Sequence, residues 1–220
     1  MQKTGVALGR RRSERSRRAI LDAAAKLLSK RGYADITIEG IAATAGVGKT
    51  TIYRWWPTKA SIYMDLYAEL AAKVTPPADT GNVATDLSLL LRGAFRLYRE
   101  TAAGLALAGI VAEAQSNATV SRIVRNEFAP SRRQIILTIL ERAARRGEIP
   151  KDVDLDLLSE AVAGASWYCV LVGSAPLTDR HASRLINTII RGIFPAKVNG
   201  RVSRPARPGL KVTEDQAQVG

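Results

Sequence analysis

The chain has 220 residues, of which 46% are hydrophobic, and it carries a formal net charge of +13. This length allows one large or two small domains with a sizeable core. No run of about 18 apolar residues predicts a membrane span, and the basic N-terminus is not followed by the apolar segment of a signal peptide. We therefore expect a cytoplasmic protein with no membrane partner.

Residues that support metal or acid–base chemistry are scarce. The sequence has one histidine, His181, and one cysteine, Cys169, which excludes histidine metal clusters and an intramolecular disulfide. We interpret Cys169 as a small buried hydrophobe and His181 as a surface side chain. We expect no metal, no cofactor and no catalytic site.

The first residues are strongly basic. Seven cations lie in the first 20 residues, where Glu14 is the opposing charge, and the excess of positive charge lies mainly in the two tails. We predict a flexible basic arm over residues 1–15, a first helix over about residues 13–31, and a disordered basic tail over residues 196–220.

Residues 36–59 predict two short helices around a glycine turn. Thr37 is placed to cap the first helix, and Gly46 to end it in the left-handed conformation that glycine enters without steric cost. Ile52 is the main inward-facing residue of the second helix, which Pro57 ends. The outward side of that helix carries cations, hydroxyls and aromatic rings, which is how a protein presents a helix to DNA.

The pattern Ala-Gly-Val-x-Lys-x-Thr-Ile-Tyr-x-x-Trp-Pro-x-Lys, preceded by Thr-Ile-x-x-Ile-Ala, resembles the TetR family of transcriptional regulators. The resemblance covers residues 16–67. It implies an all-α homodimer of about nine helices, with an N-terminal three-helix helix-turn-helix DNA-binding domain over residues 16–75. A C-terminal helical bundle over residues 83–195 would bind a small effector and dimerise. The implied function is a ligand-responsive regulator, and we expect a repressor that a small molecule releases from a palindromic double-stranded DNA operator, with activation left open.

Carried over by position, the family's contacts to bases or phosphates fall on one set of residues: Thr37, Gly48, Lys49, Thr50, Thr51, Tyr53, Arg54, Trp55 and Lys59. Two positions depart from the family pattern, since Gly48 replaces the commoner serine and Ala60 the usual glutamate. We also hypothesise that the arm touches phosphates or enters the minor groove, through Arg10, Arg11, Arg12 and Arg15.

Two alternatives compete with this interpretation. Residues 43–50 are one glycine short of a phosphate-binding P-loop, but a P-loop must follow a buried strand, and the spacing before residue 43 is helical. A nucleotide-binding enzyme is therefore disfavoured. A sequence-independent architectural DNA-binding protein is the second alternative.

The prolines and glycine of residues 75–82 predict the loop between the two domains. Aromatic and apolar residues after it are candidates for the wall of an effector pocket: Leu91, Phe95, Tyr98, Ile110, Trp167, Tyr168 and Leu171. Each of them also suits an ordinary core. The arginines of the helix after the loop, Arg92, Arg96 and Arg99, are compatible with an anionic ligand.

The last two predicted helices carry apolar and small-residue stripes. In the family that the chain resembles, such helices form a four-helix dimer interface, and the candidates here are Leu158, Ala161, Ala165, Leu185, Ile186, Ile189 and Ile193. A dimer is required because one recognition helix reads only a half-site, and the second must lie roughly 34–36 Å away. The alternative is that these stripes complete the core of a single subunit.

Overall fold

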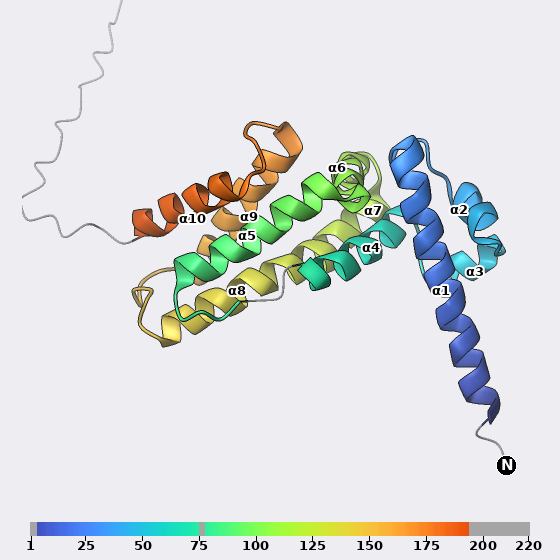
Figure 1. Ribbon diagram of the computed structural model, residues 1–220, viewed down its shortest axis with the longest axis horizontal. Helices are drawn as coiled ribbons and strands as arrows, with labels where there is room; N and C mark the ends of the chain where they lie inside the picture. The colour runs from blue at the N-terminus through green and yellow to red at the C-terminus, as the bar shows by residue number, and fades with distance from the viewer. Residues whose placement is uncertain (1–3, 75–77, 194–220) are drawn as a thin grey trace, which may run out of the picture.

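The computed structural model describes residues 4–74 and 78–193, and all regular secondary structure within those ranges is helical. The elements in chain order are α1 (Thr4–Arg31), α2 (Ile38–Ala45), α3 (Lys49–Tyr53), α4 (Lys59–Val74), α5 (Val83–Glu100), α6 (Ala102–Ala114), α7 (Ala118–Ile123), a π-helical segment (Val124–Phe128), α8 (Ala129–Arg145), α9 (Leu155–Val172) and α10 (Asp179–Ile193). Helices α1 to α3 lie at one end of an elongated molecule, and the bundle of α5 to α10 extends away from them (Figure 1). The predicted all-α fold is confirmed.

Within the described ranges the prediction of about nine helices is also confirmed, because α7, the π-helical segment and α8 form one uninterrupted helix. Pro130 lies in the first turn of α8 and does not break this helix. Proline has no N–H for the ordinary helical bond, and the wider π turn directly before it changes the backbone pairing at that point.

The start of the chain is more ordered than its composition predicts. Residues 4–15, which we expected to form a flexible arm, are the first turns of α1. This stretch contains no proline, and it extends a helix that packing already holds further along, so each added residue gains a hydrogen bond without a new nucleation cost. The rest of the predicted arm, residues 1–3, and the predicted tail, residues 196–220, lie outside the described residues.

The helix-turn-helix forms as its sequence predicts. The Thr37 hydroxyl oxygen accepts a hydrogen bond from the Gly40 amide at 3.1 Å and caps α2. Gly46 ends α2 with φ 67° and ψ 34°, in the left-handed region. Ile41 and Ile52 are fully buried, so the inner faces of α2 and α3 meet in the core.

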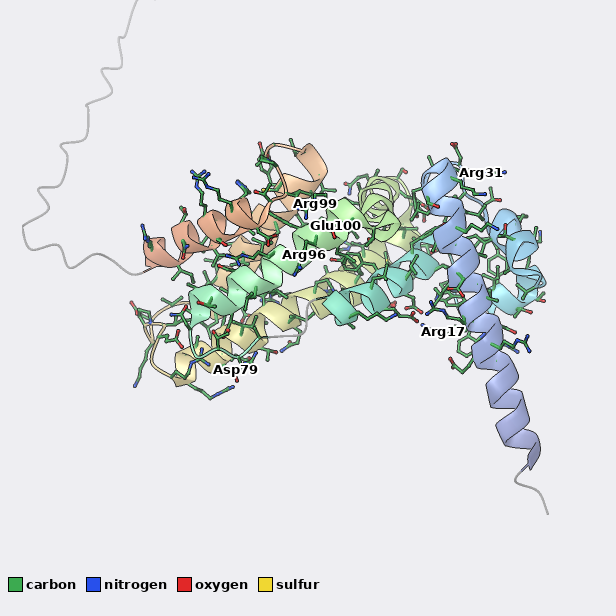
Figure 2. The ribbon with its side chains drawn as sticks, viewed as in Figure 1. Arg17, Arg31, Asp79, Arg96, Arg99 and Glu100 are labelled. Atoms are coloured by element: carbon green, nitrogen blue, oxygen red, sulfur yellow. The ribbon has the colours of Figure 1, made fainter. Side chains whose placement is uncertain are left out.

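An ionic network joins α1 to α4. Arg17 Nη1 lies 2.8 Å from Glu69 Oε1, and Arg17 Nη2 lies 3.1 Å from Asp65 Oδ2 (Figure 2). The same Asp65 oxygen accepts a hydrogen bond from Trp56 Nε1 at 2.9 Å. Trp56 is therefore held inward, and the end of the helix-turn-helix is tied to both long helices.

Two clusters of buried side chains form the core, and they do not follow the predicted domain boundary at residues 75–82. One joins α1 to α4 with α6, α7 and Phe128, and the other joins α5, α8, α9 and α10. Ile110 belongs to the first cluster. A Cβ on Gly109 would lie 2.4 Å from the Tyr33 ring, and the Tyr33 hydroxyl donates to Glu113 Oε2 at 2.6 Å. Helix α6 is thus packed directly on the DNA-binding unit.

Several residues predicted for a dimer interface face the core of the subunit instead. Ile186 and Leu158 are buried, and Leu185 and Ile189 are packed against the same cluster. The apolar stripe of α10 packs on α5, because α5 presents a complementary apolar face that the sequence pattern of α10 alone does not reveal. Of the other candidates, Ala161 is exposed and Ala165 is half-buried. The side chain of Ile193 lies outside the described part of the chain.

Helix α9 is an apolar segment of the length of a membrane span, although it contains Asp156 and Glu160. Its 18 residues have a mean hydropathy of 1.4, which is enough by length and composition to cross a membrane, and 22% of them are buried within the chain. A helix that covers another protein surface has the same composition. Among the described residues, Leu157, Tyr168, Leu171 and Val172 of this helix are exposed, so part of its apolar surface is open to solvent.

Candidate functional site

The outer face of α3 presents the side chains that the sequence predicts for DNA reading. Tyr53 is 53% exposed and Trp55 39% exposed, and Lys49, Thr50 and Arg54 are also exposed. Thr51 is half-buried. A five-residue helix with this much exposed aromatic, hydroxyl and cationic surface is suited to a groove of DNA.

Lys49 is paired in the free protein. Its Nζ lies 3.1 Å from Glu39 Oε1, with both side chains more than half exposed. The pKa of Glu39 is lowered, first by its own backbone amide and then by Lys49. Exposed pairs of this kind contribute about 1 kcal/mol or less, so a DNA phosphate can replace Glu39 as the partner.

Helix α3 has no side-chain N-cap. Gly48 is its N-cap residue and provides no side-chain cap. A Cβ at Gly48 would meet only Thr50 Oγ1, at 3.7 Å, so the serine that is common in the family would fit here. Glycine at position 48, where serine is commoner in the family, is therefore not required by a lack of space.

Lys59 has a structural environment that the resemblance did not indicate. Its Nζ donates hydrogen bonds to the carbonyl oxygens of Tyr33, Ala34 and Ile36 at 3.1, 3.3 and 3.1 Å, and it lies 4.5 Å from the centre of the Tyr33 ring. An ammonium group has three donors, and all three are used. Lys59 thus clamps the turn after α1, and any phosphate contact must compete with these bonds.

A cavity of about 90 Å³ lies between α4, α5, α8 and α9. Of the predicted ligand-binding residues, Leu91, Tyr98 and Trp167 line it. Phe95 and Ile110 are buried elsewhere in the core, and Tyr168 and Leu171 are exposed on the outer face of α9. These four residues do not line this cavity, because the sequence of a helix does not reveal which neighbour covers each of its apolar residues.

The polar groups of the cavity include the hydroxyls of Tyr67, Tyr98 and Ser166 and the guanidinium of Arg132. The Tyr67 hydroxyl donates to the Tyr98 hydroxyl at 3.3 Å, and the Cζ of Arg132 lies 5.7 Å from the centre of the Tyr67 ring. Burial raises the pKa of both tyrosines, so both stay protonated at neutral pH. The sequence analysis missed Arg132, although its position three and four residues before Ile135 and Ile136 places it on the apolar face of α8.

The other candidate groups lie elsewhere. Arg92 donates to Ser183. Arg99, labelled with Glu100 in Figure 2 near the C-terminal end of α5, donates to the Leu177 carbonyl oxygen and to Glu100. The imidazole of His181 stacks on Phe95, with ring centres 6.3 Å apart, so it is more enclosed than a surface side chain. Cys169 is buried, as predicted. Residues 4–74 and 78–193 contain no group of three or more His, Cys, Asp or Glu side chains that could hold a metal ion.

Two family models match the chain. Residues 20–66 match the model described as "Bacterial regulatory proteins, tetR family", and residues 77–189 match "Tetracyclin repressor-like, C-terminal domain". The first match spans the helix-turn-helix, and the second spans most of the helical bundle. Residues 43–50 accordingly form the end of α2, a turn and the start of α3, and not the strand and loop of a nucleotide-binding site.

Individual relatives agree with these matches. The HTH-type transcriptional regulator YdeS of Bacillus subtilis is 28% identical over 84% of this chain and 93% of its own length. The DNA-binding transcriptional repressor TetR of Mycobacteroides abscessus is 29% identical over 81% and 94%. The crystal structure of the TetR family regulator SCO0332 is 30% identical, covers 81% of this chain and 98% of that one, and superposes with a TM-score of 0.70.

A further solved structure shares the fold. FadR of Bacillus subtilis, in complex with stearoyl-CoA, is 23% identical, covers 80% of this chain and 98% of its own, and superposes with a TM-score of 0.60.

The environment of Lys59 leads to a stability prediction. Lys59→Met keeps most of the side-chain length but removes the hydrogen bonds to three carbonyl oxygens, and we expect it to lower the free energy of unfolding by about 1–3 kcal/mol. Lys49→Met removes only an exposed ion pair and should change stability by less than about 1 kcal/mol. Urea denaturation of the two variants measures the difference. Equal stability losses would show that Lys59 is not a clamp.

Proposed function

The chain belongs to the TetR family and is a DNA-binding helix-turn-helix transcriptional regulator, and from this premise we propose a homodimeric repressor that a small molecule releases from its operator. The observation that carries the proposal is the exposed face of α3, whose Tyr53 and Trp55 rings lie on the surface beside Lys49. We further propose that the protein works in the cytoplasm, where bacterial DNA is accessible, and that it has no enzymatic activity.

Our proposed reading head consists of the nine residues predicted from the sequence, with unequal roles. Lys49, Thr50 and Tyr53 would meet bases or phosphates in the major groove, while Arg54 would reach the backbone. The Cζ of Arg54 lies 5.8 Å from the centre of the Trp55 ring, and this stacking would hold the guanidinium near the groove. The basic first turns of α1 would add contacts to phosphates.

The proposed dimer forms through α9. Its uncovered side carries Leu157, Ala161, Gly164, Tyr168 and Leu171, at alternating intervals of four and three residues. That spacing produces one continuous stripe along a helix. An apolar stripe open to water is unfavourable, and the same stripe on a second subunit would cover it in a symmetric contact.

The effector is proposed to act through α4. Tyr67 and Ala71 of α4 line the cavity between the helices of the bundle, and the same helix begins at Lys59, beside the helix-turn-helix. A ligand that separates the walls of the cavity would therefore move α4. FadR in complex with stearoyl-CoA is a precedent for a small molecule in this fold. Such a ligand lowers the affinity for DNA only if it binds the state with displaced α4 more tightly than the DNA-binding state.

DNA binding is tested by footprinting and by point variants. DNase footprinting of the region upstream of the gene and its neighbours should show a protected pseudo-palindrome. Tyr53→Ala and Lys49→Ala should each weaken binding to that site by about 1–3 kcal/mol, because each removes a contact in the groove. Lys151→Ala removes an exposed lysine far along the chain and serves as the charge control. Equal affinity of all three variants, or no protected site, would contradict the proposed reading head.

The dimer is tested by sedimentation velocity. Leu157→Glu places a charge in the apolar stripe and should convert the dimer to a monomer and weaken operator binding. Leu89→Glu is the matched control, because Leu89 is an exposed leucine on α5 outside the stripe. A Leu157→Glu variant that still sediments as the native protein would rule out α9 as the interface.

A further inference from the structure

The cavity wall contains a cation without a counter-charge. Arg132 forms no ion pair with any described residue, and its single hydrogen bond among them runs from Nε to Ser131 Oγ at 3.5 Å. The adjacent Arg133, by contrast, is paired with Asp156. The Arg132 side chain is half-buried, and it lies where a ligand would supply the partner.

The tyrosine pair leaves a second open donor in the same cavity. Because the Tyr67 hydroxyl donates to the Tyr98 hydroxyl, the proton of Tyr98 has no acceptor among the described residues. Both tyrosines and Arg132 line the one cavity. The Tyr98 hydroxyl and the Arg132 guanidinium are thus two donors in one cavity, and no carboxylate is among the described residues that line it.

The guanidinium is also held in place before any ligand arrives. Its Cζ lies 5.7 Å from the centre of the Tyr67 ring and 5.9 Å from that of Phe128. Phe128 ends the π-helical segment, and single π turns inside α-helices occur frequently at functional sites. A planar cation stacked in this way presents its N–H edge for paired hydrogen bonds.

We propose that the effector is an amphipathic carboxylic acid whose carboxylate binds Arg132 and accepts the Tyr98 hydroxyl proton. Its chain or ring lies against Leu91, Ala94 and Ile136, which line the apolar part of the cavity. A carboxylate matches the guanidinium with two parallel hydrogen bonds, whereas an alcohol leaves the charge unpaired. This inference rests on the proposed function, because it places the effector in this cavity.

The size of the cavity explains how such an acid acts. A cavity of about 90 Å³ is smaller than the roughly 150 Å³ that holds one benzene molecule. An acid with an eight-carbon chain exceeds this volume, and in our proposal the walls move apart when it binds. Tyr67 is both a wall residue and a stacking partner of Arg132, so the displacement falls on α4.

The test compares octanoate with 1-octanol, which have chains of equal length and differ in the acidic group. Binding to the full chain without DNA is followed by calorimetry and by tryptophan fluorescence, since Trp167 lines the cavity. Octanoate should bind about 10-fold to 100-fold more tightly than octanol. Arg132→Gln should abolish this preference, Tyr98→Phe should reduce it, and Arg132→Lys should retain part of it.

Arg125→Gln is the matched control, because it removes an exposed arginine from the same continuous helix. Melting curves establish that each variant is folded. Equal affinities of the native chain for the two probes, absence of octanoate binding at millimolar concentration, or the same loss in Arg125→Gln as in Arg132→Gln would overturn the proposal. Operator release is measured separately: octanoate that binds through Arg132 but leaves the operator occupied supports the carboxylate site and rejects its regulatory role.

Discussion

Helix α4 contacts both the helix-turn-helix unit and the helical bundle, and its buried tyrosines limit how these two parts can move relative to each other. The Tyr63 hydroxyl donates to the Ala24 carbonyl of α1 at 3.1 Å, and the Tyr67 hydroxyl, one turn later, donates to Tyr98 of α5. Both side chains are buried in the same cluster. A close-packed interior deforms little, so a displacement of Tyr67 is passed to Tyr63 and to the helix that supports the reading head.

Tyr33 provides the second fixed point between the halves. Its ring fills the space beside Gly109 of α6, its hydroxyl donates to Glu113, and Lys59 of α4 binds its carbonyl oxygen. Helices α1, α4 and α6 therefore meet at one residue. The contacts inside the helix-turn-helix do not involve residues that line the cavity. This arrangement therefore favours movement of the helix-turn-helix as one rigid body. The cavity and the reading face are separate sites joined by α4, which is what regulation by a ligand requires.

Local chemistry made the helix-turn-helix predictable, and long-range packing made the bundle hard to predict. Thr37, Gly46 and Ile52 have roles that follow from capping, backbone freedom and helical spacing within a few residues, and all three were placed correctly. The stripe of α10 packs against α5 within the subunit, and the Tyr168 side chain is 59% exposed among the described residues and does not line the cavity. A sequence pattern shows that a helix face is apolar, but it does not identify the surface that packs against it.

The central claim is that occupation of the cavity changes the separation of the two reading heads. Ala43 is exposed on α2, so a spin label can be attached to Ala43→Cys in a Cys169→Ser background, and pulsed dipolar spectroscopy then measures the distance across the dimer. With operator bound, we predict one narrow distribution of distances between the two spin labels, set by half-sites roughly 34–36 Å apart. With octanoate in the cavity, we predict that this distribution shifts. An unchanged distribution in protein saturated with octanoate would contradict it.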